Sequence, residues 1–147
     1  MVSYLPMGTR RKSREYALQL LYQWEGERSA PTSLLAEFWR GQKTTASTRE
    51  FAEQLFQGAV EAVEEIDALL AAHAQNWRLE RMAAIDRNLL RLAVYEMRAF
   101  PKTSAAVVIN EALEIAKRFS GAESAEFVNG ILDAVRKALE PDSPVPG

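Results

Sequence analysis

Residues 82–100, MAAIDRNLLRLAVYEMRAF, decide the fold, because apolar side chains surround most of the helix that this stretch predicts. The helix stops before Pro101, which cannot continue it. A helix with so little polar surface is covered on most sides by its neighbours. We therefore expect residues 82–100 to form the central helix of an all-α bundle.

Five other segments have the periodicity of helices, and no alternating strand pattern of useful length occurs. Together with the central helix they predict a compact bundle of about six to seven helices. A capping box of Ser47 and Glu50 predicts the start of a long helix that ends or bends near Trp77, and Ser104 and Ser124 are candidate N-caps. The five segments are residues 9–26 (beginning at Thr9 or Ser13), 32–41, 47–76, 104–119 and 124–139.

The length and composition predict one soluble domain over residues 1–147, with flexible tails at about residues 1–8 and 141–147. The chain has no cysteine, which excludes disulfides, cysteine nucleophiles and sulfur-bound metals. No uninterrupted apolar run is long enough to cross a bilayer, and no apolar stretch follows the early charges. We expect a cytoplasmic protein that has no membrane partner.

Side chains that carry enzyme chemistry are sparse. His73 is the only histidine, and Leu70 stands where a Glu-x-x-His metal motif needs a carboxylate, so a structural role is expected for His73. Neither a nucleotide-binding glycine loop nor a nucleophile motif occurs. We expect no enzyme, no catalytic residue, no cofactor and no metal. A solvated helix face explains the acidic cluster best, which comprises Glu61, Glu64, Glu65 and Asp67.

Positive charge is concentrated near the start of the chain. Residues 1–14 hold four cations and no acid, whereas the other 14 cations share the chain with all 20 acids. A helix N-terminus disfavours cations, so an arriving phosphate would account for their placement. A solubilising tail explains the charge equally well from composition alone. We call these four residues the basic head: Arg10, Arg11, Lys12 and Arg14.

The first helix carries a polar strip that continues from the basic head. Arg11 and Tyr22 are separated by three turns and by about 20° around the axis, and Gln19 lies on the same outer side. Arginine binds phosphates and stacks on bases, which favours short single-stranded RNA as the ligand. A tyrosine packed inside the bundle is the alternative for Tyr22.

Four segments resemble the NusB family in order and spacing: SREYALQLLYQWE (13–25), IDRNLLRLAVYEM (85–97), VVINEALEIAKRF (107–119) and SAEFVNGILDAV (124–135). The resemblance covers residues 10–138 and implies a fold of two helical subdomains. It implies a non-catalytic bacterial factor for transcription antitermination. Such a factor binds boxA RNA of ribosomal RNA operon transcripts together with NusE, a small-subunit ribosomal protein. Other Nus factors and RNA polymerase complete the larger complex.

The resemblance also implies site residues. The partner-binding position falls on Asp86, and the RNA-binding positions fall on Arg10, Arg11, Lys12, Arg14, Gln19, Tyr22, Phe127 and Asn129. Structural roles compete at two of them, since Phe127 can be a core residue and Asn129 can bond to backbone inside the bundle.

Two further expectations concern glycine and arginine in the helices. Gly130 is expected to allow close helix packing, because glycine inside a helix otherwise costs up to about 1 kcal/mol relative to alanine. The stripe of Arg87, Arg91 and Arg98 is expected to pair with neighbouring acids rather than extend a basic surface. The sequence does not decide whether the protein forms a homodimer. It also allows an alternative function, as a helical adapter that binds protein without binding RNA.

Overall fold

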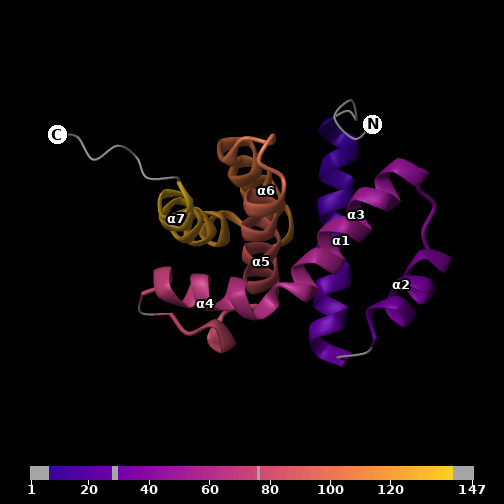
Figure 1. Ribbon diagram of the computed structural model, residues 1–147, viewed down its shortest axis with the longest axis horizontal. Coiled ribbons are helices and arrows are strands. Elements are labelled where there is room, and N and C mark those ends of the chain that lie inside the picture. Colours follow the sequence, from indigo (N-terminus) through magenta and orange to yellow (C-terminus); the bar gives the residue numbers. More distant parts are fainter. Residues whose placement is uncertain (1–6, 28–29, 76, 141–147) are drawn as a thin grey trace.

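The computed structural model describes residues 7–27, 30–75 and 77–140. Within these ranges the chain forms seven α-helices, one 3-10 turn and no strand (Figure 1), which confirms the all-α bundle. The elements are α1 (Met7–Glu27), α2 (Pro31–Arg40), α3 (Ala46–Glu61), α4 (Val63–His73), η2 (Leu79–Arg81), α5 (Ala84–Ala99), α6 (Ala105–Phe119) and α7 (Ala122–Leu139).

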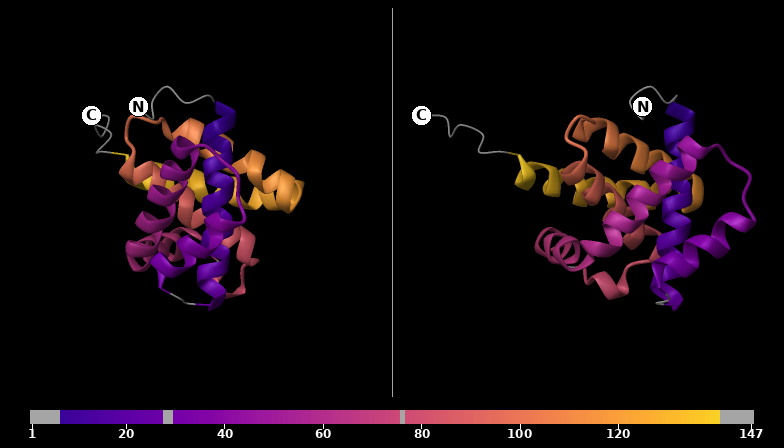
Figure 2. Two further views of the ribbon diagram at one scale, coloured as in Figure 1. Left: turned by 90° about the vertical axis from the view of Figure 1, so that its right-hand side faces the viewer. Right: turned by 45° about the vertical axis from the view of Figure 1, so that its right-hand side comes forward.

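Helix α5 is central, as its sequence predicts. It packs against α1, α3, α4, α6 and α7, and its apolar residues between Leu89 and Val94 are buried. Helices α1, α2 and α3 form one group, and α4 to α7 form the other (Figure 1). Helix α1 lies alongside α3 in both views of Figure 2. The side chain of Ser13 joins these two helices, because its hydroxyl donates to the carbonyl of Thr48 at 2.8 Å.

The long helix expected from residue 47 onward is two helices, which is a correction. Helix α3 ends at Glu61, and α4 begins at Val63 after a break at Ala62. Apolar residues continue at helical spacing across the break, so periodicity alone does not reveal it. The N-cap is Thr45, whose hydroxyl accepts from the Thr48 amide at 3.2 Å, rather than Ser47.

The other helix starts are partly as expected. Ser104 caps α6 and accepts from the Val107 amide at 3.2 Å. Helix α7 begins earlier than predicted, at Ala122, because Gly121 adopts a φ of 114° that lets the chain turn directly into the helix. Ser124 therefore lies inside the first turn and bonds elsewhere.

The described residues include only part of the two predicted flexible tails. Residues 7–8 belong to α1, and residues 1–6, 76 and 141–147 lie outside the described residues. No helix in the described part of the chain combines the length and the apolar character needed to span a membrane.

Candidate nucleic-acid interface

The basic head is tied into the bundle by buried carboxylates. Arg14 donates through Nε and Nη2 to Glu96 of α5 at 2.8 and 2.6 Å, and its side chain is only 6% exposed. Arg11 donates through Nε and Nη2 to Glu111 of α6 at 2.8 and 2.7 Å. Glu111 is itself 1% exposed and lies 3.5 Å from Nη1 of Arg14. Two arginines and two acids thus join α1 to α5 and α6.

The expectation that Arg14 faces outward to RNA is wrong in this structure. Its guanidinium is enclosed, and a buried carboxylate already neutralises it. The sequence does not reveal this pairing, because Glu96 lies 82 residues further along the chain. Arg11 keeps a 40% exposed side chain. Its hydrogen bonds to Glu111 raise the pKa of Arg11 and lower the pKa of Glu111.

Outward positive charge lies near the ion pairs that link α1 to α6. Lys12 is exposed, with Nζ 4.9 Å from the ring centre of Tyr16. Arg118 is also exposed, and it bridges from the end of α6 to the buried Glu15 of α1 at 3.0 Å. Arg10 is half-buried, with its guanidinium 5.5 Å from the ring centre of Phe51. The surface charge is therefore smaller than four clustered cations suggest.

Tyr22 points outward and does not pack inside the bundle. It is 53% exposed and lines a groove of about 240 Å³ together with exposed Phe119. We call this the Tyr22 groove; its lining residues are Leu18, Gln19, Tyr22, Gln23, Ile85 and Phe119. Gln19 and Tyr22 thus share an open surface, as their spacing predicts.

A second hollow, of about 430 Å³, adjoins the first. We call it the Trp77 hollow; its lining residues are Trp77, Arg81, Met82, Ala83, Asp86, Ser120, Glu123, Ser124 and Phe127. Asp86 accepts a hydrogen bond from the Ser124 hydroxyl. The rings of Phe127 and Trp77 meet edge to face, with centroids 5.3 Å apart. Residues 85 and 119 line one hollow while 86 and 120 line the other, so the two meet at the start of α5.

The structure does not bring Asn129 into this surface. Asn129 is exposed, but it lies about 200° around α7 from Phe127. Gly130 is exposed as well, and a Cβ built there would have no atom within 4 Å. The expectation that Gly130 serves close helix packing is therefore wrong, and nothing in the structure explains the glycine.

The arginine stripe of α5 forms ion pairs, as expected. Glu25, near the end of α1, accepts from Arg87 Nε at 2.7 Å and from Arg91 Nη1 at 2.6 Å. Arg91 also donates to Asp67 of α4 through two bonds of 2.8 Å. Burial by itself would raise the pKa of Glu25, but the hydrogen bonds and charges of the two arginines lower it to about 2. The third arginine, Arg98, pairs with Glu65 at 3.4 Å.

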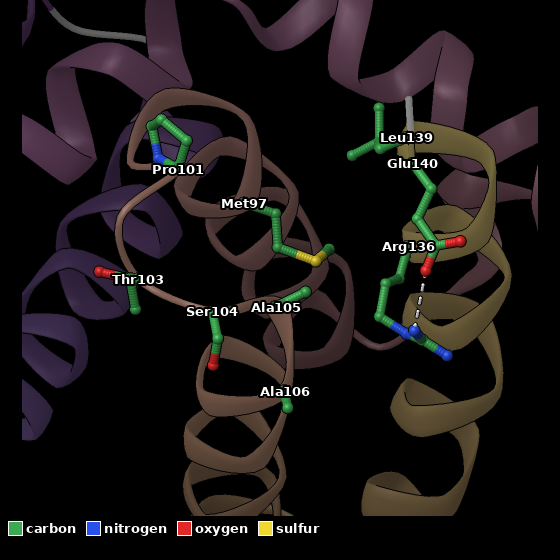
Figure 3. Close-up of a pocket in the computed structure, with 9 residues that line it drawn as sticks. All are labelled: Met97, Pro101, Thr103, Ser104, Ala105, Ala106, Arg136, Leu139 and Glu140. Atoms are coloured by element: carbon green, nitrogen blue, oxygen red, sulfur yellow. Dashed lines mark hydrogen bonds and ion pairs between the residues drawn. The ribbon is translucent and has the colours of Figure 1, made fainter. Parts of the chain in front are cut away.

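A third hollow lies away from these residues. It occupies about 450 Å³ between the α5–α6 turn and the end of α7, where Arg136 bonds to Glu140 (Figure 3). None of the predicted site residues lines it. Among the described residues, no group of three or more histidines and carboxylates could hold a metal ion.

Sequence reasoning missed three residues of this surface: Trp77, Arg118 and Phe119. On sequence alone, Trp77 was considered only as the place where a helix ends or bends, although its side chain is 56% exposed. The available signal was the segment WRLER, residues 77–81, in which an aromatic residue precedes two arginines, with Glu80 between them. That pattern is common in proteins that bind nucleic acid.

The fold and the surface define a class: an all-helical protein whose exposed aromatic side chains line two adjoining hollows beside cations. The NusB family model matches residues 11–137, and the chain belongs to this family.

Relatives extend over nearly the whole chain. The chain is 51% identical over 134 residues to the transcription antitermination protein NusB of Koribacter versatilis. The aligned region covers 90% of this chain and 92% of the relative. The chain is 43% identical over 141 residues to the same protein of Solibacter usitatus, with 94% and 96% covered.

Solved structures of the same family also match this fold. NusB of T. maritima is 36% identical with a TM-score of 0.79, covering 90% of this chain and 93% of that one. A crystal structure of antitermination factors NusB and NusE in complex with dsRNA matches at 29% identity and a TM-score of 0.80, covering 90% and 99%.

Proposed function

We propose that this chain is a non-catalytic transcription antitermination factor that binds RNA together with NusE. In this proposal the RNA is the single-stranded boxA element of ribosomal RNA operon transcripts. The complex, with other Nus factors and RNA polymerase, makes transcription processive and resistant to termination. The observation that carries the proposal is the surface on which Tyr22, Asp86 and Phe127 line adjoining hollows. Family membership supports it, since relatives are transcription antitermination proteins.

The cations around the start of α1 are suited to hold the RNA backbone. Lys12 and Arg118 are exposed and offer charge to phosphates. Arg11 uses Nε and Nη2 for Glu111, which leaves its Nη1 group to donate to a phosphate. The carboxylate thereby orients the guanidinium before RNA arrives, which lowers the entropy lost on binding.

The aromatic rings that line the two hollows are suited to hold unpaired bases. Tyr22 and Phe119 line one hollow and Phe127 lines the next, so successive bases of a single strand can stack along the surface. Asp86 lies where the hollows meet, and we propose that it contacts NusE beside the RNA. Asn129 lies on another side of α7, so its proposed role is contact with a flanking part of the RNA.

A helical adapter that binds NusE without touching RNA is the second candidate. The pairing of Arg11 and Arg14 with buried acids favours it, because those charges are already neutralised. The two candidates differ in whether the isolated protein has salt-dependent affinity for RNA.

Fluorescence anisotropy with labelled boxA RNA, with and without NusE, tests the proposal. We expect binding that tightens with NusE and weakens as salt rises, by a slope of about 0.7 per phosphate contact on logarithmic axes. Lys12→Ala should reduce that slope, whereas Lys43→Ala, at an exposed position between α2 and α3, is the matched control. NusE binding with no RNA affinity in either state would favour the adapter.

Self-association needs a separate measurement. A homodimer remains a prediction, and it could cover the Tyr22 groove that the RNA or NusE needs. Light scattering of the protein before and after NusE is added would show whether the partner replaces a second copy.

A further inference from the structure

Residues 77–81 display free cations beside an exposed aromatic ring. Arg78 and Arg81 are exposed, and neither pairs with a carboxylate within the described residues. Trp77 precedes them with an indole that is 56% exposed. The basic head differs, since Arg11 and Arg14 already bind acids there. Although the exposed Glu80 stands between them, Arg78 and Arg81 are therefore less neutralised by direct ion pairs than Arg11 and Arg14.

The backbone of this segment is held in place from the inside. Arg87 donates through Nη1 to the carbonyls of Leu79 and Met82 at 2.9 and 2.8 Å. Met82 is buried, and Leu79 packs against the core. Arg87 is fixed in turn by Glu25 of α1. The outward side chains thus stand on a pre-organised turn, and ordering it costs little when a ligand binds.

Trp77 has a fixed position as well. Its amide donates to the carbonyl of Ala74 at 3.1 Å, which ties the residue to the end of α4. Phe127 of α7 meets its ring at an interplanar angle of 77°. An indole that is supported on one side and more than half exposed is suited to stack on a flat ligand.

We propose that Trp77 stacks on one unpaired base of the bound RNA while Arg81 and Arg78 contact the adjacent phosphates. This inference rests on the proposed function, because it names a further contact of the same RNA. Asp86 and Glu123 also line the Trp77 hollow, and their carboxylates repel a phosphate there. A base edge with amino groups can instead donate to these carboxylates. In this proposal the base therefore enters the hollow, and the phosphates of the RNA backbone lie toward Arg81 and Arg78.

An acidic protein segment would also suit a tryptophan and two arginines. The carboxylates in the hollow disfavour such a segment and leave an RNA base as the better occupant. Binding experiments with RNA alone and with NusE alone separate the two.

The test uses the whole chain and boxA RNA without NusE. Trp24 and Trp39 are buried, so a change in the exposed tryptophan emission reports on Trp77. We expect RNA to quench this emission and Trp77→Ala to weaken RNA binding by about 5- to 140-fold, the range for one stacked base. Trp77→Phe keeps an aromatic face and should stay within about 5-fold of the parent affinity. Val107→Ala, an exposed apolar residue of α6, is the matched control.

The arginines have their own test. Arg81→Ala should lower the salt slope by about 0.7, the value for one phosphate of a single strand. Arg40→Ala, at an exposed arginine of α2, should leave the slope unchanged. Thermal unfolding of each variant identifies any loss of affinity that comes from misfolding.

Three outcomes would overturn the inference. In the first, the parent protein binds RNA, which keeps the proposed function, but Trp77→Ala binds equally well and the emission does not change. In the second, Trp77→Ala loses affinity for NusE alone and none for RNA, which makes the segment a protein-docking surface. In the third, the parent protein binds no RNA without NusE, which overturns the inference; if it also binds none with NusE, the proposed function fails as well.

Discussion

Two stretches of the chain place arginines beside an aromatic ring, residues 10–14 on α1 and residues 77–81 before α5. In the first, Arg14 lies 5.9 Å from the ring centre of Phe51 and is bound by Glu96 inside the bundle. In the second, Arg78 and Arg81 remain exposed beside Trp77. Cations in a sequence are therefore not equivalent to cations on a surface: distant carboxylates that pack against them decide which remain available for a ligand.

The largest expected effect is on stability, from Arg14→Met. The change leaves Glu96 buried without its main partner, and such a loss costs about 3–5 kcal/mol of unfolding free energy. Urea denaturation at neutral pH measures it. The double variant Arg14→Met, Glu96→Leu removes both charges and should recover most of the loss. A single variant as stable as the parent would refute the structural role of Arg14.

Glu25→Gln should have the next largest effect, because Glu25 fixes Arg87 and through it the turn at residues 79–82. The pKa of this carboxyl is about 2 in the folded chain against an ordinary 4.5, so its contribution is present above pH 4.5 and is lost as pH falls toward 2. Because solvent screens this partly exposed carboxyl, its contribution is smaller than the roughly 3 kcal/mol that the shift alone would give. Denaturation at pH 7 and pH 3 should show a difference between parent and variant that narrows at the lower pH.

The Glu25→Gln variant also tests whether the order of the turn at residues 79–82 affects RNA binding. If Arg87 loses its anchor, residues 77–81 become less ordered, and RNA affinity should fall together with stability. Arg40→Ala, which removes an exposed pair with Glu37, is the control that should change neither property appreciably.

Arg11→Ala should cost less, roughly 1–2 kcal/mol, because the guanidinium is partly exposed and Arg14 still lies near Glu111. Acid sensitivity gives a second measure. The pKa of Glu111 is lowered mainly by its hydrogen bond from Arg11, so the variant should lose stability at neutral pH and differ less from the parent in acid. A pH-independent difference between the two proteins would show that the pair does not act through this carboxylate.

The sequence predicts features that depend on residues a few positions apart better than it predicts contacts between residues far apart in the chain. Apolar periodicity predicted the central place of residues 82–100, and the local cap at Ser104 was also correct. Outward positions of Gln19 and Tyr22 followed from their angular spacing on one helix. These features depend on residues a few positions apart, where helix geometry is known in advance.

The errors concern contacts between distant segments. Burial of Arg14 depends on where α5 and α6 bring Glu96 and Glu111, and no local pattern encodes that. The importance of Trp77 likewise depends on Phe127, which lies 50 residues later in the numbering and contacts it only in the folded chain. Charge and aromatic content suggested the kind of ligand, while tertiary packing decided which residues can reach it.

The smallest expected stability change compares Lys12→Ala with Arg78→Ala, one exposed cation from each stretch. Both side chains are exposed, and Lys12 makes only a 3.9 Å pair with Glu15 and a contact with the Tyr16 ring, so each variant should unfold within about 1 kcal/mol of the parent in urea. Both should nevertheless weaken RNA binding at low salt, and the loss should shrink as salt rises, because each removes a phosphate contact. Equal losses would make the two stretches parts of one RNA path. A loss confined to Lys12→Ala would restrict that path to α1 and α6 and contradict the role inferred for residues 77–81.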